Sequence, residues 1–190
     1  MFPVPQTPGM PDSARQPTLA GRRVRLRPWR PEDAAAVYAA CQDPELQRWT
    51  EVPVPYLPEH AEQFVGEVAA ETWAGGGASF AVEADGALAG AMTLFGVRDG
   101  VAPVGYWTVA GHRGRGLTAE ALRVLTAWAF DRGVRRVELI ADPANTGSCR
   151  VAESAGLRAE GLLRSRYLHR GEPGDVVLYA VLAGDPRPPV

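Results

Sequence analysis

Short stretches of the 190-residue chain are β-rich or alternate apolar with polar residues, and this pattern predicts strands. The predicted strands lie at 22–29, 78–84, 87–97, 101–109, 134–142, 157–164 and 175–182. Stretches with apolar residues three or four positions apart, or with helix-opening prolines, predict helices at 31–42, 59–74, 117–132 and 143–156. A further short helical turn is predicted at 43–49, and Asp85-Gly86 predicts a tight hairpin between two of the strands.

The order of these elements indicates the fold class. A run of antiparallel strands gives way, halfway along the chain, to strand–helix–strand units, which predicts a mixed α/β (α+β) fold. One domain is expected over residues 19–183. The Pro-rich leader 1–18 is expected to be disordered, and 184–190 to form a flexible tail.

Composition narrows the functional classes. The net charge of −2 argues against a protein that coats nucleic acid, and no apolar run is long enough for a membrane span. Cys41 and Cys149 form no CxxC pair, and three scattered histidines give no metal-ligand spacing. We therefore expect no metal, no nucleic acid and no membrane partner. A cytoplasmic location fits this cysteine usage, although two cysteines leave a disulfide open.

The loop from Arg113 to Thr118 joins a predicted strand to the start of a predicted helix. Its glycines allow sharp turns, and the free N–H groups of a helix start favour an anion such as a pyrophosphate. The alternative is a Gly-rich turn whose arginines are merely solvated. Neither a GxxxxGK[ST] P-loop nor a GxGxxG dinucleotide motif is present.

This loop resembles the R/Q-x-x-G-x-G/A signature of the GNAT N-acetyltransferases. Arg113, Gly116 and Thr118 fill its three defined positions, with Thr118 in place of the usual Gly or Ala. The similarity covers about residues 20–182 and includes RLRPWRPEDA, DPELQRW and a closing D-x-V-L-Y pattern, as in the RimJ/RimL branch of ribosomal-protein N-terminal acetyltransferases. It implies the GNAT fold, with a mixed, mostly antiparallel sheet of six to seven strands and about four helices on its two faces.

The resemblance also implies that acetyl-CoA is the cosubstrate and assigns residues to its parts. The pyrophosphate would bind the loop formed by Arg113, Gly114, Arg115, Gly116, Leu117 and Thr118. Backbone groups of Trp107, Thr108 and Val109 would bind the pantetheine arm and polarise the thioester carbonyl, which is often the largest catalytic contribution. Asn145 would bind the arm, Ser148 would bond or protonate the departing thiol, and Arg150 would lie near the phosphates.

Some of these residues have simpler interpretations, and one family residue is missing. Asn145 could simply be the N-cap of the following helix, and Ser148 could be an ordinary serine of its first turn. Many GNAT enzymes place a tyrosine acid seven residues after the Asn, but this chain has Ala152 there. A tyrosine acid at that position is therefore excluded, and Ser148 is the better candidate.

The sequence gives fewer indications of the residues that would bind the amine acceptor. Glu51 and Glu160 are candidate bases or water relays, although each could be a solvated or salt-bridged carboxylate. Candidate acceptor-pocket residues are Trp49, Tyr56, Tyr106 and Tyr167. An α-amine, with a pKa near 7.7–8.0, needs less help to lose its proton than a lysine amine near 10.4. A site without an obvious strong base therefore favours an N-terminal α-amine.

The predicted function is acetyl transfer from acetyl-CoA to a primary amine, with a protein or peptide N-terminal α-amine as the favoured acceptor. One alternative is a small-molecule acyltransferase acting on an aminoglycoside, polyamine or amino acid, with an acetyl or succinyl donor. Another is an acyl-CoA-binding domain without catalysis. Edge strands in the last third could support a homodimer, which the sequence leaves open.

Overall fold

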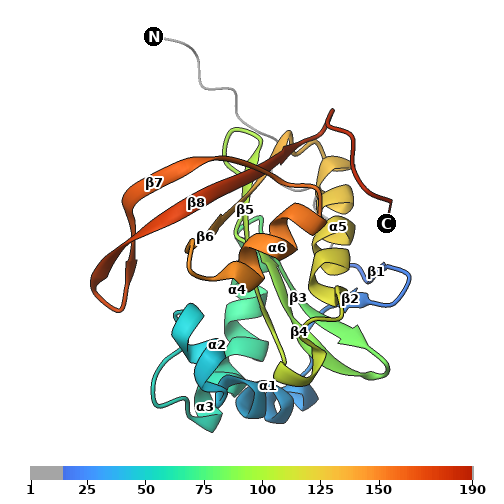
Figure 1. Cartoon of the computed structure of the whole chain (residues 1–190). Coiled ribbons are helices and arrows are strands. Elements are labelled where there is room, and N and C mark those ends of the chain that lie inside the picture. Colours follow the sequence, from blue (N-terminus) through green and yellow to red (C-terminus); the bar gives the residue numbers. More distant parts are fainter. Residues whose placement is uncertain (1–14, 190) are drawn as a thin grey trace.

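The computed structural model describes residues 15–189, in which one eight-stranded sheet carries helices on both faces (Figure 1). The strands are β1 Leu19–Ala20, β2 Arg25–Arg27, β3 Ala78–Ala84, β4 Ala87–Leu94, β5 Val101–Thr108, β6 Arg136–Ala141, β7 Arg158–His169 and β8 Glu172–Leu182. The helices are α1 Ala34–Cys41, α2 Pro44–Trp49, α3 Pro58–Gln63, α4 Ala69–Ala74, α5 Leu117–Phe130 and α6 Thr146–Ser154. Turns of 3-10 helix occupy Pro31–Asp33 and Ala110–His112, and a π-helical turn at Phe64–Val68 joins α3 to α4.

The strand order in the sheet is β1-β2-β3-β4-β5-β6-β8-β7. Neighbouring strands are antiparallel except β5 and β6, which are parallel and are connected through α5. A parallel pair needs such a crossover, because a short turn cannot bring the chain back to the same end of the sheet. The mixed fold class is confirmed, although the sheet has one or two strands more than expected, because the short β1 adds a strand at one edge.

Two apolar clusters lie on opposite faces of the sheet. On one face, Phe80 and Met92 pack with Leu122 and Leu125 of α5, all fully buried. On the other face, helices α1 to α4 pack over a second cluster, to which β3 and β4 contribute the small side chains of Ala81 and Ala91. Because side chains alternate along a strand, β3, β4 and β5 supply side chains to both clusters.

The two ends of the domain make contacts of their own. Residues 1–14 of the predicted leader lie outside the described residues, whereas the Gln16 amide donates a hydrogen bond to the Ser79 carbonyl at 2.8 Å. At the other end, the Arg187 guanidinium lies 4.7 Å over the Phe130 ring of α5. The disorder and flexibility expected at the two ends stay predictions. Within residues 15–189, no helix combines the length and apolar character needed to cross a bilayer.

The last two strands are longer than predicted. They form a hairpin, β7–β8, that extends well beyond the rest of the sheet (Figure 1). Register shifts between Ala159 and Gly161 and between Leu163 and Tyr167 interrupt the alternation that a sequence pattern relies on. The prediction therefore ended β7 too early, at 164, and began β8 too late, at 175.

Candidate active site

Strands β5 and β6 separate in the middle of the sheet. They pair only from Val101 to Pro103 against Arg136 to Glu138. Farther along, β5 pairs with β4 and β6 pairs with β8. Within residues 15–189, no strand therefore pairs with the β6-facing side of β5 between 104 and 108. This edge leaves backbone groups available to a ligand.

The direction of these backbone groups follows from the ladder between β4 and β5. The Pro103 carbonyl accepts from the amide of Phe95 at 2.9 Å, and the Val109 amide donates to Ala89 at 2.9 Å. Backbone groups alternate in direction along a strand, so the odd-numbered positions face β4 and Tyr106 and Thr108 face the open side. Of the predicted arm-binding residues, only Thr108 presents its backbone there.

Side chains of β5 also alternate between the two faces. The Trp107 ring lies 6.3 Å from the Trp29 ring in the cluster beneath α1 to α4. The Thr108 hydroxyl lies 2.7 Å from the Thr118 hydroxyl at the start of α5. Thr118 therefore connects the predicted phosphate loop to the open edge.

The loop before α5 has the geometry of an anion site. Gly114 and Gly116 have φ values of 72° and 74°, in the left-handed region that favours glycine. No hydrogen bond within residues 15–189 uses the amides of Gly114, Arg115 or Gly116 as donors. The first-turn amides of the 14-residue helix α5, beginning at Leu117, add further free donors. The Leu117 side chain itself is buried in the core.

Both arginines of this loop have acidic partners. Arg113 pairs with Asp43, the N-cap residue of α2, and its Nε also donates to the Thr108 carbonyl at 3.3 Å. Arg115 pairs with Asp85 in the β3–β4 turn, with 2.7 Å between nitrogen and oxygen. The backbone amides, more than the guanidinium groups, are thus the groups left to bind an anion. These acidic partners were not predicted from the sequence.

The start of α6 brings Ser148 to β5. The Ser148 hydroxyl lies 2.8 Å from the Tyr106 hydroxyl. Burial raises the pKa of Tyr106 to about 12, so the phenol keeps its proton at neutral pH. The Asn145 side-chain oxygen accepts from the Ser148 amide at 3.0 Å and caps α6, while no bond in the described chain uses its NH₂ group. Its capping role therefore leaves a donor for a ligand.

The two candidate bases differ in their surroundings. Glu160 makes two hydrogen bonds to the Arg136 guanidinium, at 2.9 and 2.5 Å, and these hold the Glu160 pKa below its usual value. Glu51 accepts one hydrogen bond from the Tyr167 hydroxyl and lies against His169 at the end of β7. The structure thus brings two predicted residues, Glu51 and Tyr167, together and places Glu160 in a separate ion pair.

The remaining predicted residues are placed apart from these groups. Trp49 donates to Glu45 at 2.5 Å within α2, and its ring faces the Arg48 guanidinium. Tyr56 is 5% exposed and packs in the cluster beneath α1 to α4, a position that favours a core role over acceptor contact. Arg150 is exposed on α6 and has no ionic partner within residues 15–189.

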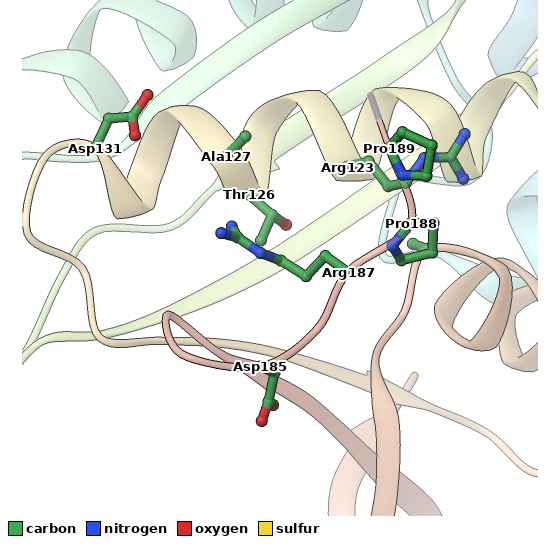
Figure 2. A pocket seen from close by; sticks show the side chains of 9 residues that line it. Arg123, Thr126, Ala127, Asp131, Asp185, Arg187, Pro188 and Pro189 are labelled. Carbon is green, nitrogen blue, oxygen red and sulfur yellow. The ribbon is translucent and has the colours of Figure 1, made fainter.

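A cavity of about 330 Å³ lies elsewhere, between the C-terminal half of α5 and the chain's tail (Figure 2). Thr126 and Arg187 line it, and none of the predicted site residues does. No group of three or more His, Cys, Asp or Glu side chains in the described chain is arranged to hold a metal ion. The two cysteines are not bonded to each other.

Comparisons with known proteins show the family to which the chain belongs. The family model described as acetyltransferase (GNAT) domain matches residues 23–158, so the chain belongs to the GNAT acetyltransferase family. The Bacillus subtilis (strain 168) protein named "Probable N-acetyltransferase YjcK" is 34% identical over 105 residues, covering 53% of this chain and 58% of YjcK. The match therefore spans little more than half of YjcK.

Two further matches are longer. "Uncharacterized N-acetyltransferase p20" of Bacillus licheniformis is 26% identical over 170 residues, covering 87% of this chain and 96% of p20. Mycobacterium smegmatis RimJ, solved in complex with CoA-disulfide, has 29% sequence identity and a TM-score of 0.78, with 88% of each chain covered. The predicted resemblance to the RimJ/RimL branch is confirmed.

Proposed function

We propose that this protein transfers an acetyl group from acetyl-CoA to a primary amine, with a peptide or protein N-terminal α-amine as the favoured acceptor. The observation that carries the proposal is the set of amides at Gly114, Arg115 and Gly116, which have no partner within residues 15–189 and lie at the start of α5, beside the open edge of β5. This donor set suits a pyrophosphate. Family membership and the relative solved with a CoA species support the same cosubstrate.

The open edge of β5 supplies the groups for the rest of the cosubstrate. Backbone groups of Tyr106 and the Thr108 amide would pair with the pantetheine arm, since the Thr108 carbonyl already accepts from Arg113, and the NH₂ group of Asn145 would add a donor. A backbone N–H of this edge would stabilise the oxyanion that forms when the thioester carbonyl is attacked. Ser148 approaches from the α6 side of the strand, through its bond to Tyr106.

Acetyl transfer from a thioester to a protonated amine requires the nitrogen to lose two protons and the sulfur to gain one. An ammonium acceptor loses one proton to Glu51 or to solvent, and the neutral amine attacks the thioester carbon. When the tetrahedral intermediate collapses, the C–S bond breaks and its electron pair leaves on sulfur. The nitrogen gives up a second proton, and the thiolate takes one with Ser148 as the hydrogen-bond or proton donor. The products are the N-acetyl amine and the free thiol, with one proton released.

Calorimetry with a matched pair of glycine variants tests this proposal. Gly114 and Gly133 both have positive φ, and a Cβ added at either would meet no atom within 4 Å, but Gly133 lies beyond the far end of α5. Gly114→Ala should weaken acetyl-CoA binding about tenfold, which corresponds to about 1.4 kcal/mol. Gly133→Ala should bind like the wild type. Equal affinities for all three proteins would reject the phosphate site.

A turnover assay tests the catalytic part. Thiol release from acetyl-CoA should depend on an added peptide with a free N-terminus and should stop when that terminus is acetylated beforehand. Turnover with polyamines or aminoglycosides but not with peptides would instead support a small-molecule acceptor. Tight acetyl-CoA binding without turnover on any amine would support a binding domain without catalysis.

A further inference from the structure

The far end of the β7–β8 hairpin contacts the segment that follows α2. One terminal nitrogen of the Arg170 guanidinium lies 2.9 Å from the Gln47 carbonyl oxygen, 3.2 Å from that of Val52 and 3.5 Å from that of Thr50. A single side chain thus holds three carbonyls of a loop about 120 positions earlier in the sequence. Figure 1 shows the hairpin bending toward α2 at this point.

A second set of contacts lies beside this one. Glu51 Oε1 accepts from the Tyr167 hydroxyl at 2.9 Å and lies 2.8 Å from Nδ1 of His169. Tyr167 and His169 are two positions apart on β7, so their side chains leave the strand on the same face, and their rings stack at 6.4 Å. Burial and the nearby Glu51 carboxylate raise the pKa of Tyr167 to about 12, so its hydroxyl stays a donor.

The contacts with Tyr167 and His169 orient the Glu51 carboxylate through only one of its two oxygens. Both neighbours bind the same oxygen, and no hydrogen bond within residues 15–189 uses Oε2. The side chain is 51% exposed, so a ligand from solvent can approach this oxygen. A carboxylate fixed in this way is suited to bind an ammonium group and to accept its proton.

The segment carrying Glu51 also reaches the cosubstrate side. Asp43 at the start of α2 pairs with Arg113 of the phosphate loop, and α2 has six residues, a rise of about 9 Å. Beyond α2, Val52 packs in the same apolar cluster as Trp107 of β5. The loop that carries Glu51 therefore lies on the side of the sheet that Trp107 faces, opposite the side on which Tyr106 bonds Ser148.

We propose that Arg170 and His169 are positioning residues for the acceptor. Arg170 holds the loop 47–52 by its carbonyls, and His169, with Tyr167, orients Glu51 so that Oε2 receives the primary ammonium group of the acceptor. This inference rests on the proposed function and specifies its acceptor side. Neither residue stood out in the sequence, because the contact partners lie far apart along the chain.

The test compares Arg170→Ala with Arg166→Ala. Arg166 is an exposed arginine of β7, four positions before Arg170, and has no hydrogen-bonding or ionic partner in the described chain. Arg170→Ala should raise the KM for a peptide acceptor at least tenfold and leave the Kd for acetyl-CoA within twofold of the wild type. Arg166→Ala should change neither value. Equal acceptor KM values for the two variants would overturn the proposal.

Conservative variants separate orientation from general damage. His169→Gln retains a side-chain donor toward Glu51 and should keep the acceptor KM within threefold of the wild type, whereas His169→Ala should raise it about tenfold. Tyr167→Phe, which removes the other donor, should also raise it. If Gln and Ala at position 169 behave alike, the role of His169 in orienting Glu51 is refuted.

Hydrogen exchange provides a readout that does not depend on activity. Amides in the segment 47–52 should exchange faster in Arg170→Ala than in Arg166→Ala, because the carbonyl contacts that hold the loop are lost. Unchanged exchange would overturn the proposal even in a protein without turnover. If the wild type fails to bind acetyl-CoA while the loop responds as expected, the proposed function fails and the loop contact stands. Faster exchange with an unchanged acceptor KM would refute the acceptor role.

Discussion

Replacement of Ser148 by alanine tests the chemistry at the open edge of β5. In the wild type, the Ser148 hydroxyl bonds a Tyr106 phenol at 2.8 Å, and the raised pKa of that phenol keeps it neutral. Ser148 therefore has a hydroxyl partner that can supply a proton, and its own proton can point at the departing sulfur. Alanine removes this donor and leaves the Asn145 cap in place, because the cap uses the Ser148 backbone amide.

The expected loss follows from one hydrogen bond to a charged group. Such a bond contributes about 1.5–3 kcal/mol, and about 1.4 kcal/mol corresponds to a tenfold change in rate. The rate of acetyl transfer should therefore fall about 10- to 150-fold in Ser148→Ala. Tyr106→Phe should cause a smaller loss, because the Ser148 hydroxyl remains and can exchange its partner for water.

Single-turnover kinetics measure this step directly. With enzyme in excess over acetyl-CoA and a saturating peptide acceptor, quenched samples report the chemical step without product release. Ser154→Ala, in the last turn of the same helix, is the matched control and should react like the wild type. A rate within twofold of the wild type for Ser148→Ala would refute the assignment. A matching loss of acetyl-CoA affinity would assign Ser148 to binding instead.

Four predictions concern the stability of the scaffold. Asp33 is 8% exposed and pairs with buried Arg27 at 2.7 Å, so Asp33→Asn should lower the unfolding free energy in urea by about 3–5 kcal/mol. Burial alone would raise the Asp33 pKa, but hydrogen bonds from Arg27 and the Arg30 amide lower it. The stability that the ionised Asp33 contributes should therefore be complete above about pH 4 and should be lost as the pH falls through the lower pKa of the folded state. Acid titration of unfolding measures this loss. Phe80→Ala, at a fully buried position, should cost about 3–5 kcal/mol in the same urea assay. A Cβ at Gly77 would lie 2.5 Å from a β4 carbonyl oxygen, so Gly77→Ala should lower the melting temperature measured by circular dichroism.

The fold was predictable where local pattern and packing agree. The strands from 78 to 109 and the helix from 117 follow from alternation, an Asp-Gly turn and an apolar stripe, and all of them form. The β7–β8 hairpin was underestimated because its bulges and the positive φ of Ser165 interrupt alternation, and because its exposed edge carries many charged residues. The extension of this hairpin is what carries Arg170 to the loop after α2.

The candidate site was predictable in its backbone part only. The glycine spacing at 114–116 indicated a loop with free amides. Glycine readily adopts left-handed backbone conformations, and the first N–H groups of a helix have no partner within the helix. The partners of Arg113, Glu51 and Arg170 depend on how distant segments meet, and one sequence holds no local signal for that. Similarly, which backbone groups of β5 face the open side depends on the register with β4.

An NMR titration of the ¹⁵N-labelled protein with acetyl-CoA tests the central claim most directly. If the pyrophosphate binds the loop before α5, the amide signals of Gly114, Arg115 and Gly116 should move in a saturable way, and S-acetylpantetheine, which lacks the pyrophosphate, should leave them in place. Saturation by acetyl-CoA with these three signals unmoved, or with shifts confined to the cavity beside Arg187, would contradict the account.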